Sequence, residues 1–411
     1  MPPRRPSRAR NLLQPPPLPD SRPYRLSLLY AVVFVEIGIA MPFTPVWLDA
    51  LGLDARVIGL LLALPIATRI LATAPLMSLI DRGIGPQRLV LAASLGVALT
   101  YATMPAVAGF GWPVLAVVVV LNAVAAAPLV PSIDFLTLSA VRRDPRLDYA
   151  RIRVAGSVAF LAANLAGGAM LVELGGRVAV PVFLTGFALI AALVAAAIRL
   201  GDAARPPPPV AGPRPALPTS LWFSILAAAA IQSSHAAIYG FASIHWTAHG
   251  FSTATVGALW ATGVAAEIVL FALAGRLPER WKSPFRLLGL GGAAALARAL
   301  GMTVLGGELL PVVALQTLHG LTFGATQLGA MAAVSRFAPE GARGRAQGTL
   351  SAASALAAAC ATLLSGVVYR AGGPLAFALM APAALAGLAF VAMAARAAKA
   401  EPFGAAATER L

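Results

Sequence analysis

Charged residues are scarce in this chain of 411 residues: Asp, Glu, Lys and Arg together make up 11% of it, against 59% hydrophobic residues. A soluble domain carries roughly 25% charged residues, because its surface must stay hydrated. A chain this poor in charge cannot shield its apolar residues from water, so most of its outer surface must face lipid. The composition therefore excludes an ordinary soluble protein and predicts an all-α membrane protein.

Cysteine and the common catalytic motifs are also missing. The single cysteine, Cys360, excludes an intrachain disulfide. No H-E-x-x-H, G-x-S-x-G or P-loop pattern is present, and no group of residues has metal-ligand spacing. Ser234 and His235 are adjacent, but neighbouring residues point about 100° apart on a helix, which argues against a nucleophile and its base. We therefore expect no enzyme, no metal and no cofactor, and any transport must draw on an ion or solute gradient.

Twelve hydrophobic runs are long enough to span a bilayer, since a hydrocarbon core about 30 Å thick needs about 20 apolar residues per helix. Glycine and alanine are frequent in these runs and allow close approach between helices within a membrane. The predicted spans are 25–48, 56–79, 88–108, 112–138, 150–173, 178–199, 220–246, 254–276, 284–306, 309–334, 344–369 and 373–395.

A proline-rich stretch divides the sixth run from the seventh. Residues 206–209 are all proline, and further prolines follow up to Pro218. Proline removes a backbone donor and clashes with the preceding turn, so this stretch cannot be helical. The predicted organisation is a disordered cytoplasmic tail at 1–24, an N-terminal six-helix bundle at 25–199, a cytoplasmic linker at 200–219, a C-terminal six-helix bundle at 220–396 and a cytoplasmic tail at 397–411.

The positions of the 31 Lys and Arg residues predict the orientation. If both termini are cytoplasmic, only Arg56, Arg177 and Arg370 fall in external segments, while Arg69 and Arg298 lie within spans. All the other basic residues then face the cytoplasm, as the positive-inside rule requires, and one missed helix would destroy this bias. The net charge of +15 is therefore a topological signal of a bacterial inner-membrane protein, not evidence for nucleic-acid binding.

Ionisable residues within the spans are the candidate functional residues. An ionised group at mid-bilayer costs at least about 2.5–3.5 kcal/mol. Such groups must therefore pair, meet water in a cavity, or be neutral during part of a cycle. The N-terminal candidates are Glu36, Arg69 and Asp134; the C-terminal candidates are His235, Tyr239, Glu267, Arg298 and His319.

Two pairs of charges also permit a purely structural interpretation. Asp134 with Arg153, and Glu267 with Arg298, could form static salt bridges between helices. We favour a functional role for Asp134, Glu267 and Arg298, which is the default for ionisable residues inside a membrane. Glu36 and Arg69 stay open between the two interpretations.

Spacing groups the histidines with other polar residues. His235 and Tyr239 are four residues apart and share a helix face, as do Gln316 and His319 at a spacing of three. Histidine is the side chain whose unperturbed pKa lies near neutrality. A histidine beside a buried carboxylate is therefore a candidate proton relay, whereas His245 is expected at the outer interface, together with His249.

Several stretches resemble known transporters. Residues 81–88, between the second and third spans, resemble the major facilitator loop pattern G-x-x-x-D-R-x-G-R-R, although Met77 replaces the leading glycine and one residue is inserted. The more specific stretches resemble the phenylpropionic acid transporter family of that superfamily and extend from the first span to the eleventh. They are 41–43, 47–48, 128–134, 148–157, 234–246, 257–260, 264–267 and 316–324. The resemblance implies the major facilitator fold, with two pseudo-symmetric bundles of six helices.

The family is in turn similar to the lactose-permease-type proton symporters. Those symporters place a carboxylate on helix 4 eight residues before an Arg pair, and an arginine at the start of helix 5. Asp134, residues 142–143 and Arg153 have this spacing.

The same symporters use a carboxylate on helix 8, an arginine on helix 9 and a histidine on helix 10, which Glu267, Arg298 and His319 match by helix and type. They also carry a carboxylate one turn after the histidine, where this chain has Thr322. That departure leaves open which residue carries a proton, and whether transport is coupled at all.

The resemblance implies a proton-coupled symporter that works by alternating access on an aromatic carboxylate such as a phenylpropionate-like acid, with a sugar or nucleoside as runner-up. It would act as a monomer in the lipid bilayer, without cofactors. An exporter of drugs or metabolites is the alternative, although residues 166–169 lack the proline of the exporter motif. We assign substrate binding to Asp134, Arg153, His235, Tyr239, Trp260 and Arg298. We assign proton coupling to Glu267, His319 and Glu36, and a conformational loop to Asp81, Arg82 and Arg88. We assign no role to Arg69.

Overall fold

The computed structural model describes residues 22–144, 146–174, 176–197, 216–339 and 342–401. Within these ranges the chain is helical and contains no strands. Twelve helical segments are long and apolar enough to cross a membrane, which confirms the number of predicted spans. The predicted tails and linker fall mostly outside the described residues, although the first helix already begins at Arg22 and the last continues to Ala400.

The first six spans are continuous helices except for one break. The fourth span is divided at residues 127–128, directly before Leu129. The elements are α1 (Arg22–Ala50), α2 (Ala55–Asp81), α3 (Pro86–Ala108), α4 (Trp112–Ala126), α5 (Leu129–Arg143), α6 (Tyr149–Leu174) and α7 (Gly176–Ala197).

The second six spans are more often interrupted. Short π-helices break the seventh and tenth spans, and a short helix precedes the last. The elements are α8 (Thr219–Ser233), η2 (Ile238–Ala242), α9 (Ser243–Ala248), α10 (Thr253–Ala274), η3 (Glu279–Lys282), α11 (Pro284–Leu305), α12 (Leu309–Thr317), η4 (Gly320–Ala325), α13 (Thr326–Phe337), α14 (Arg343–Gly372), α15 (Leu375–Ala378) and α16 (Met380–Ala400).

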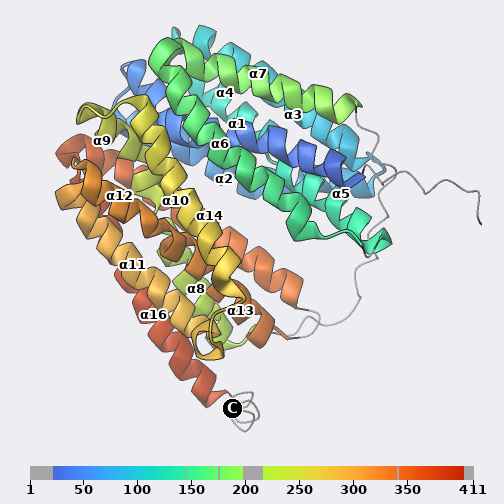
Figure 1. The fold of residues 1–411 in the computed structure, drawn as a ribbon, viewed down its shortest axis with the longest axis vertical. Coiled ribbons are helices and arrows are strands. Elements are labelled where there is room, and N and C mark those ends of the chain that lie inside the picture. Colours follow the sequence, from blue (N-terminus) through green and yellow to red (C-terminus); the bar gives the residue numbers. More distant parts are fainter. Residues whose placement is uncertain (1–21, 145, 175, 198–215, 340–341, 402–411) are drawn as a thin grey trace, which may run out of the picture.

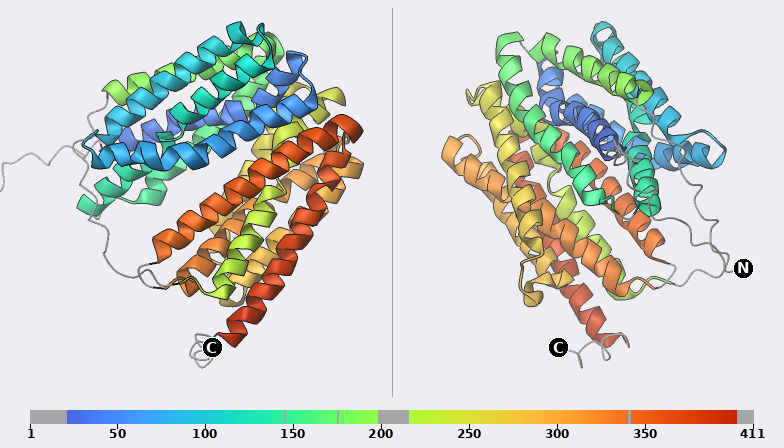
Figure 2. Two further views of the ribbon diagram at one scale, coloured as in Figure 1. Left: turned by 180° about the vertical axis from the view of Figure 1, so that it is seen from behind. Right: turned by 45° about the vertical axis from the view of Figure 1, so that its right-hand side comes forward.

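The helices form two groups, α1–α7 and α8–α16, which meet at one end and diverge toward the other (Figure 1). The end where they meet, called the closed end here, carries residues 51–54 and 373–374. The other, the linker end, carries residues 82–85 and Pro218. Figure 2 shows the same divergence from two further sides. The helices of the two groups are therefore packed together at the closed end and farther apart at the linker end.

Two close helix pairs join the groups at the closed end. A Cβ built on Gly59 of α2 would lie 2.9 Å from the Cα of Gly366 on α14, so glycine is required for the helices to approach this closely. Gly168 of α6 packs in the same way on Gly257 of α10. The hydroxyl of Thr253 donates a hydrogen bond of 2.9 Å to the carbonyl of Gly168.

An ion pair also links the two groups at the closed end. Arg370 at the end of α14 lies 2.6 Å from the carboxylate of Asp54, the N-cap residue of α2. Both side chains are partly exposed. The closed end is therefore held by glycine packing, one hydrogen bond and one ion pair.

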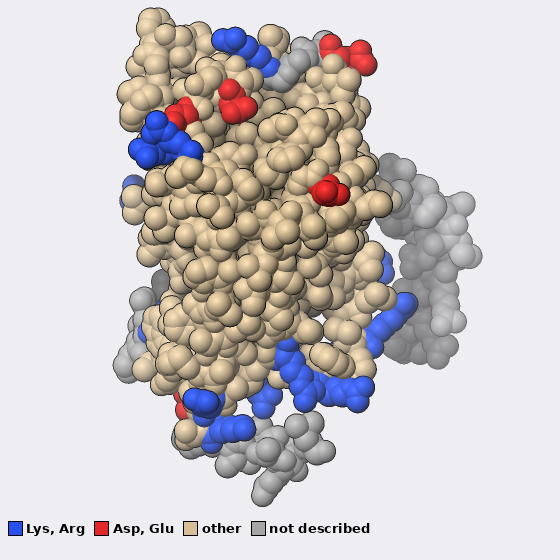
Figure 3. All heavy atoms as spheres, turned by 90° about the vertical axis from the view of Figure 1, so that its left-hand side faces the viewer, with Lys and Arg blue, Asp and Glu red and all other residues tan. Residues whose placement is uncertain are grey.

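Apolar side chains cover the outside of the helices. Large hydrophobic residues are exposed along many spans, as expected for a surface that faces lipid tails. Figure 3 shows one face whose middle is mostly free of charge, with Lys and Arg side chains at its lower end and both basic and acidic side chains near its upper end. The buried core contains few large side chains; Trp246, Tyr30 and Phe43 are the largest fully buried ones.

Candidate functional site

Arg298 of α11 is the centre of a polar network in the C-terminal group. Its side chain is only 2% exposed. One guanidinium nitrogen donates to the amide oxygen of Gln316, and another lies 3.2 Å from Nδ1 of His319. The amide nitrogen of Gln316 donates in turn to the carbonyl of Leu259 at 2.9 Å. The arginine is thus fixed in place by two neighbours on the tenth span, one of which is in turn bonded to the eighth span.

The contact with Arg298 determines the tautomer of His319. A guanidinium can only donate, so Nδ1 of His319 must accept and the ring hydrogen must lie on Nε2. That nitrogen faces the carboxylate of Glu267 on α10, 3.6 Å away. Glu267 of α10, Arg298 of α11 and His319, between α12 and η4, therefore lie together. The expected alternative of a Glu267–Arg298 salt bridge is absent among the described ion pairs.

His235 packs against His319, but its ring nitrogens are hydrogen-bonded to Thr322 and Gln232. Its Nε2 is 2.9 Å from the hydroxyl of Thr322, and its Nδ1 is 3.0 Å from the carbonyl of Gln232. The rings of His235 and His319 meet edge to face with centroids 5.3 Å apart. The π-helices η2 and η4 begin shortly after these two histidines, and π-bulges in α-helices often mark functional sites.

Aromatic rings line the side of this network. Tyr239 lies 5.7 Å from Trp260 and 6.3 Å from His319, measured between ring centroids. Phe323 stacks on His319 at 5.5 Å. The indole nitrogen of Trp260 donates to Ser243 at 2.9 Å, which fixes the ring. The predicted substrate residues His235, Tyr239 and Trp260 are therefore close together.

Asp134 of α5 has two tyrosine partners. The hydroxyls of Tyr30 on α1 and Tyr149 at the start of α6 both donate to the same carboxylate oxygen, at 2.5 and 2.9 Å. Burial, followed by the hydrogen bond to Asp134, raises the pKa of Tyr149 and keeps it a donor. The predicted salt bridge between Asp134 and Arg153 does not occur among the described ion pairs, because the tyrosines occupy this carboxylate.

Arg153 stacks on aromatic rings instead. The central carbon of its guanidinium lies 4.1 Å from the ring centroid of Phe34 and 5.2 Å from that of Tyr30. Such cation–π contacts contribute about 0.5–2 kcal/mol while leaving the nitrogens at the edge of the group able to donate. The side chain is half-buried, and its charge acts on Glu267 in the opposite helix group. Arg153 and Glu267 are therefore close enough to interact, although they belong to different helix groups.

Glu36 and Arg69 form a separate polar cluster in the N-terminal group. Glu36 is 5% exposed, and its polar neighbours are the hydroxyl of Tyr101 on α3 and the charge of Arg69 on α2. Leu62 of α2 lies next to Gly240 of η2. Arg69 follows Leu62 by seven residues, or about two helical turns, so both lie on one face. That face points toward the space between the groups, and Arg69 is exposed there.

The other predicted positions lie away from these clusters. Arg82 and Arg88 are exposed at the linker end, next to Gly83 with its φ of +97°; the side chain of Asp81 falls outside the described residues. His249 is exposed near the closed end, as expected for an interfacial residue, whereas His245 is buried and its ring lies 4.2 Å from that of His249.

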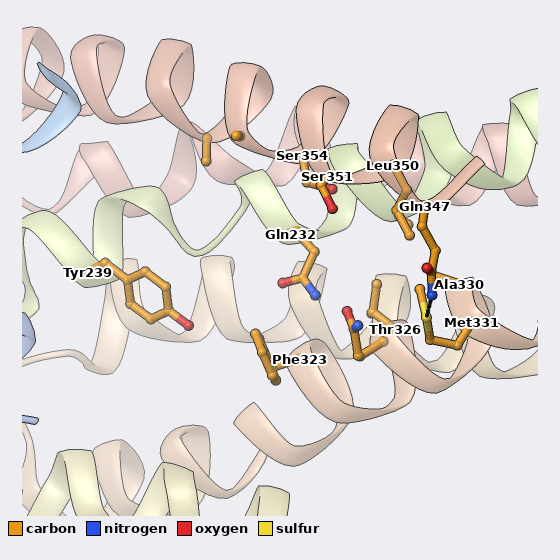
Figure 4. Close-up of a pocket in the computed structure, with 14 residues that line it drawn as sticks. Gln232, Tyr239, Phe323, Thr326, Ala330, Met331, Gln347, Leu350, Ser351 and Ser354 are labelled. Atoms are coloured by element: carbon orange, nitrogen blue, oxygen red, sulfur yellow. Dashed lines mark hydrogen bonds between the residues drawn. The ribbon is translucent and has the colours of Figure 1, made fainter. Parts of the chain in front are cut away.

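A cavity of about 560 Å³ extends from the aromatic cluster toward the linker end. Figure 4 shows Tyr239 at one end of it, Gln347 and Met331 at the other, and Gln232 and Phe323 between them. None of its lining residues is charged, and its polar groups belong to Gln232, Tyr239, Thr326, Gln327, Gln347, Ser351 and Ser354.

Several residues of this site were missed from the sequence. Tyr30, Gln327 and Gln347 have no motif of their own and resemble ordinary residues of a helix interior. Tyr149 and Phe323 lie within the family-like stretches 148–157 and 316–324, which could have drawn attention to them. A further signal was available for Gln232, which precedes His235 by three residues and therefore shares its helix face.

Comparisons with known proteins agree with this architecture. The profile of the MFS_1 like family matches residues 24–379. Over 312 residues, 74% of this chain and 80% of the relative, the chain is 32% identical to the "Probable 3-phenylpropionic acid transporter" of Escherichia coli (strain K12).

Solved structures of transporters share the fold. The nucleoside transporter NupG aligns with a TM-score of 0.69 and 16% identity, covering 93% of this chain and 98% of that one. A peptide transporter POT in complex with alafosfalin aligns with a TM-score of 0.73 and 14% identity, covering 92% and 95%. The chain therefore belongs to the MFS_1 like family and is a major facilitator transporter, a class of proteins that are not enzymes.

Proposed function

We propose that this transporter is a proton-coupled symporter of a small aromatic carboxylate. The observation that carries the proposal is the state of Arg153, which is half-buried, stacked on Phe34 and without a carboxylate partner among the described ion pairs. A planar guanidinium with a free edge suits a carboxylate, because it can donate two parallel hydrogen bonds to it.

The two arginines of the site then have different roles. Arg298 donates to Gln316 and His319 and is only 2% exposed, so it supports the site from behind. Arg153 contacts the substrate carboxylate. The distinction narrows the expectation from the sequence, in which both arginines were assigned to the substrate.

The aromatic part of the substrate packs on Tyr239 and Phe323, which line the cavity, with Trp260 behind Tyr239. Aromatic pairs are worth about 0.5–1.5 kcal/mol beyond the area they bury. The relative from Escherichia coli, whose name describes a 3-phenylpropionic acid transporter, supports an aromatic acid as the substrate.

Glu267 is the proposed site of coupling. It lies 3.6 Å from Nε2 of His319 and within the field of Arg153 in the other helix group. When Arg153 binds the substrate, its charge is satisfied by the substrate carboxylate, and Glu267 binds a proton. Glu36 is a second carboxylate candidate. The energy source is the proton gradient, and no cofactor takes part.

Transport follows by alternating access, in which two helix groups rock around a central site. The closed end must separate, so the Gly59–Gly366 and Gly168–Gly257 contacts and the Asp54–Arg370 pair must open. The loop with Arg82 and Arg88 adjusts at the opposite end. We place the monomer in the bacterial inner membrane with both termini and the linker end in the cytoplasm, so that the open side faces inward.

Uptake into proteoliposomes tests this function. An inward proton gradient should drive accumulation of phenylpropionate-like acids above the level in protein-free liposomes, which corrects for passive entry of the neutral acid. Loss of accumulation on collapsing the gradient is expected. Equal uptake with and without the gradient would exclude coupling, and uptake only against it would indicate export.

A neutral polar solute, such as a nucleoside or sugar, is the second candidate. The uncharged cavity with its amides and hydroxyls favours it, because these groups can pair with hydroxyls or a base edge. Counterflow with nucleosides and sugars, in parallel with aromatic acids, distinguishes the candidates. If only the neutral solutes exchange, the carboxylate proposal is wrong.

A further inference from the structure

His235 occupies a site that can hold either of two protonation states without losing a hydrogen bond. In the neutral state, Nδ1 donates to the carbonyl of Gln232 at 3.0 Å and Nε2 accepts from the hydroxyl of Thr322 at 2.9 Å. The carbonyl can only accept, so the ring hydrogen of the neutral form lies on Nδ1 and Nε2 has the free lone pair.

Thr322 has a second acceptor within reach. Its hydroxyl lies 3.3 Å from the backbone carbonyl of His319. If Nε2 of His235 gains a proton, it donates to the hydroxyl oxygen, and the hydroxyl hydrogen turns to that carbonyl. Every polar group keeps a partner in both states, which matters because an unsatisfied buried group costs about 1–3 kcal/mol.

His319 has no such freedom. Its Nδ1 accepts from Arg298 at 3.2 Å, so an added proton there would break this bond and set two donors and two positive charges against each other. Its Nε2 already carries the hydrogen that faces Glu267. Of the two adjacent histidines, only His235 has an acceptor nitrogen whose partner can reverse.

The charges around His235 come from three neighbouring helices. His319 contacts its ring and Arg298 lies on the far side of His319, Tyr239 on its own helix is uncharged, and Glu267 also lies beyond His319. His235 is 2% exposed, but Gln232 and Tyr239, about one turn to either side, line the cavity. A proton therefore reaches it from cavity water over about one helical turn.

We infer that His235, through its reversible hydrogen bond with Thr322, binds one of the protons carried in each transport cycle, in addition to the site at Glu267. The inference rests on the proposed proton coupling. A proton from water adds to the Nε2 lone pair in one orientation of the transporter and returns to water in the other. The π-helices that follow both histidines place the rings where a rocking motion would change their surroundings.

The number of protons transported with each substrate molecule tests whether His235 carries one of them. In proteoliposomes clamped at zero membrane potential, each coupled proton raises the equilibrium accumulation about tenfold per pH unit. The experiment determines the substrate ratio at which protein-dependent net flux vanishes, at several pH gradients. For His235→Gln, whose amide accepts from Thr322 but does not titrate, the slope of the logarithm of this ratio against the gradient should fall by one.

Control variants separate proton binding from folding. His245→Gln replaces another buried histidine of the same span and should keep the wild-type slope. Thr322→Val removes the hydroxyl whose hydrogen bond can reverse, so it should lower the slope or shift the pH dependence of uptake to lower pH. Thr322→Ser keeps a hydroxyl and should have the wild-type slope and pH dependence. The Thr322 and His245 variants should retain substrate exchange in counterflow, which needs binding and rocking but no net proton movement. For His235→Gln, the same assay measures whether the substrate still binds and exchanges.

An unchanged slope in His235→Gln, with exchange intact, overturns the inference and leaves the proposed symport standing. If the wild-type protein itself shows no slope, the proposed coupling fails first. If His235→Gln loses exchange, His235→Asn, which keeps a donor for the carbonyl of Gln232, provides the comparison; loss of exchange there too assigns His235 to the structure and overturns the proposal.

Discussion

The two helix groups hold their buried arginines in opposite ways. Arg298 is held by two neighbours of its own helix group, Gln316 and His319, which are themselves bonded onward to Leu259 and directed at Glu267. Arg153 rests on Phe34 and Tyr30 through the faces of its guanidinium. A buried cation held by hydrogen bonds organises a site, whereas a stacked cation with free donors can exchange partners during a cycle. The contrast indicates a rigid C-terminal framework and an adaptable N-terminal contact.

The carboxylates show the opposite arrangement: the fixed carboxylate lies in the N-terminal group and the free one in the C-terminal group. Asp134 accepts from two tyrosines and is fixed, while Glu267 approaches only His319, at 3.6 Å. Each group therefore contributes one constrained charge and one that is free to change partners. The two free charges, Arg153 and Glu267, belong to different groups and interact electrostatically, as a mechanism of changing partners between the groups requires.

Removing the buried arginine of the C-terminal group should have the largest effect on stability. Arg298→Leu leaves the side-chain oxygen of Gln316 and Nδ1 of His319 without their donor, and each unsatisfied buried polar group costs about 1–3 kcal/mol. We expect a clear drop in the unfolding temperature of the purified protein, measured by tryptophan fluorescence, together with loss of exchange. An unfolding temperature equal to that of the wild type would contradict the framework role.

Removing the stacked arginine should affect binding rather than folding. Arg153→Gln should weaken carboxylate binding by about 1.5–3 kcal/mol, or roughly 10- to 150-fold, because charge-assisted hydrogen bonds are lost. Arg153→Lys should not restore it, since an ammonium lacks the planar fork and stacks poorly. Substrate-induced thermal shifts measure the affinity, while the unfolding temperature without substrate should change little.

Arg151→Gln is the matched control for Arg153. It lies two residues earlier on α6, is exposed, and pairs only with Asp148 at 3.9 Å among the described ion pairs. Its loss should leave carboxylate affinity at the wild-type level. If both substitutions weaken binding equally, the effect is a general change in surface charge, and Arg153 is not the anchor.

The framework was easier to predict from the sequence than the free contacts. Hydrophobic runs define the spans, and the grouping of Glu267, Arg298 and His319 followed from their resemblance to known symporters. The tyrosine partners of Asp134 could not be predicted in this way, because Tyr30 lies 104 residues away and a tyrosine in an apolar run resembles a core residue. His235 and Thr322 are 87 residues apart and lie beside or within two π-helices, which no periodicity in the sequence predicts.

Breaking the Asp54–Arg370 ion pair, which joins the two groups at the closed end, should have the smallest effect. Both side chains are partly exposed, and such pairs contribute about 0.2–1 kcal/mol. Asp54→Asn should therefore move a modest fraction of molecules toward opening of the closed end, seen as a longer distance between spin labels at residues 53 and 371. Arg370→Gln should match it, and the double variant should add little, because one interaction is lost in all three. Glu279→Gln breaks an ion pair to Lys282 within one segment and should shift nothing; if it opens the closed end equally, the cross-group pair has no special part in holding it.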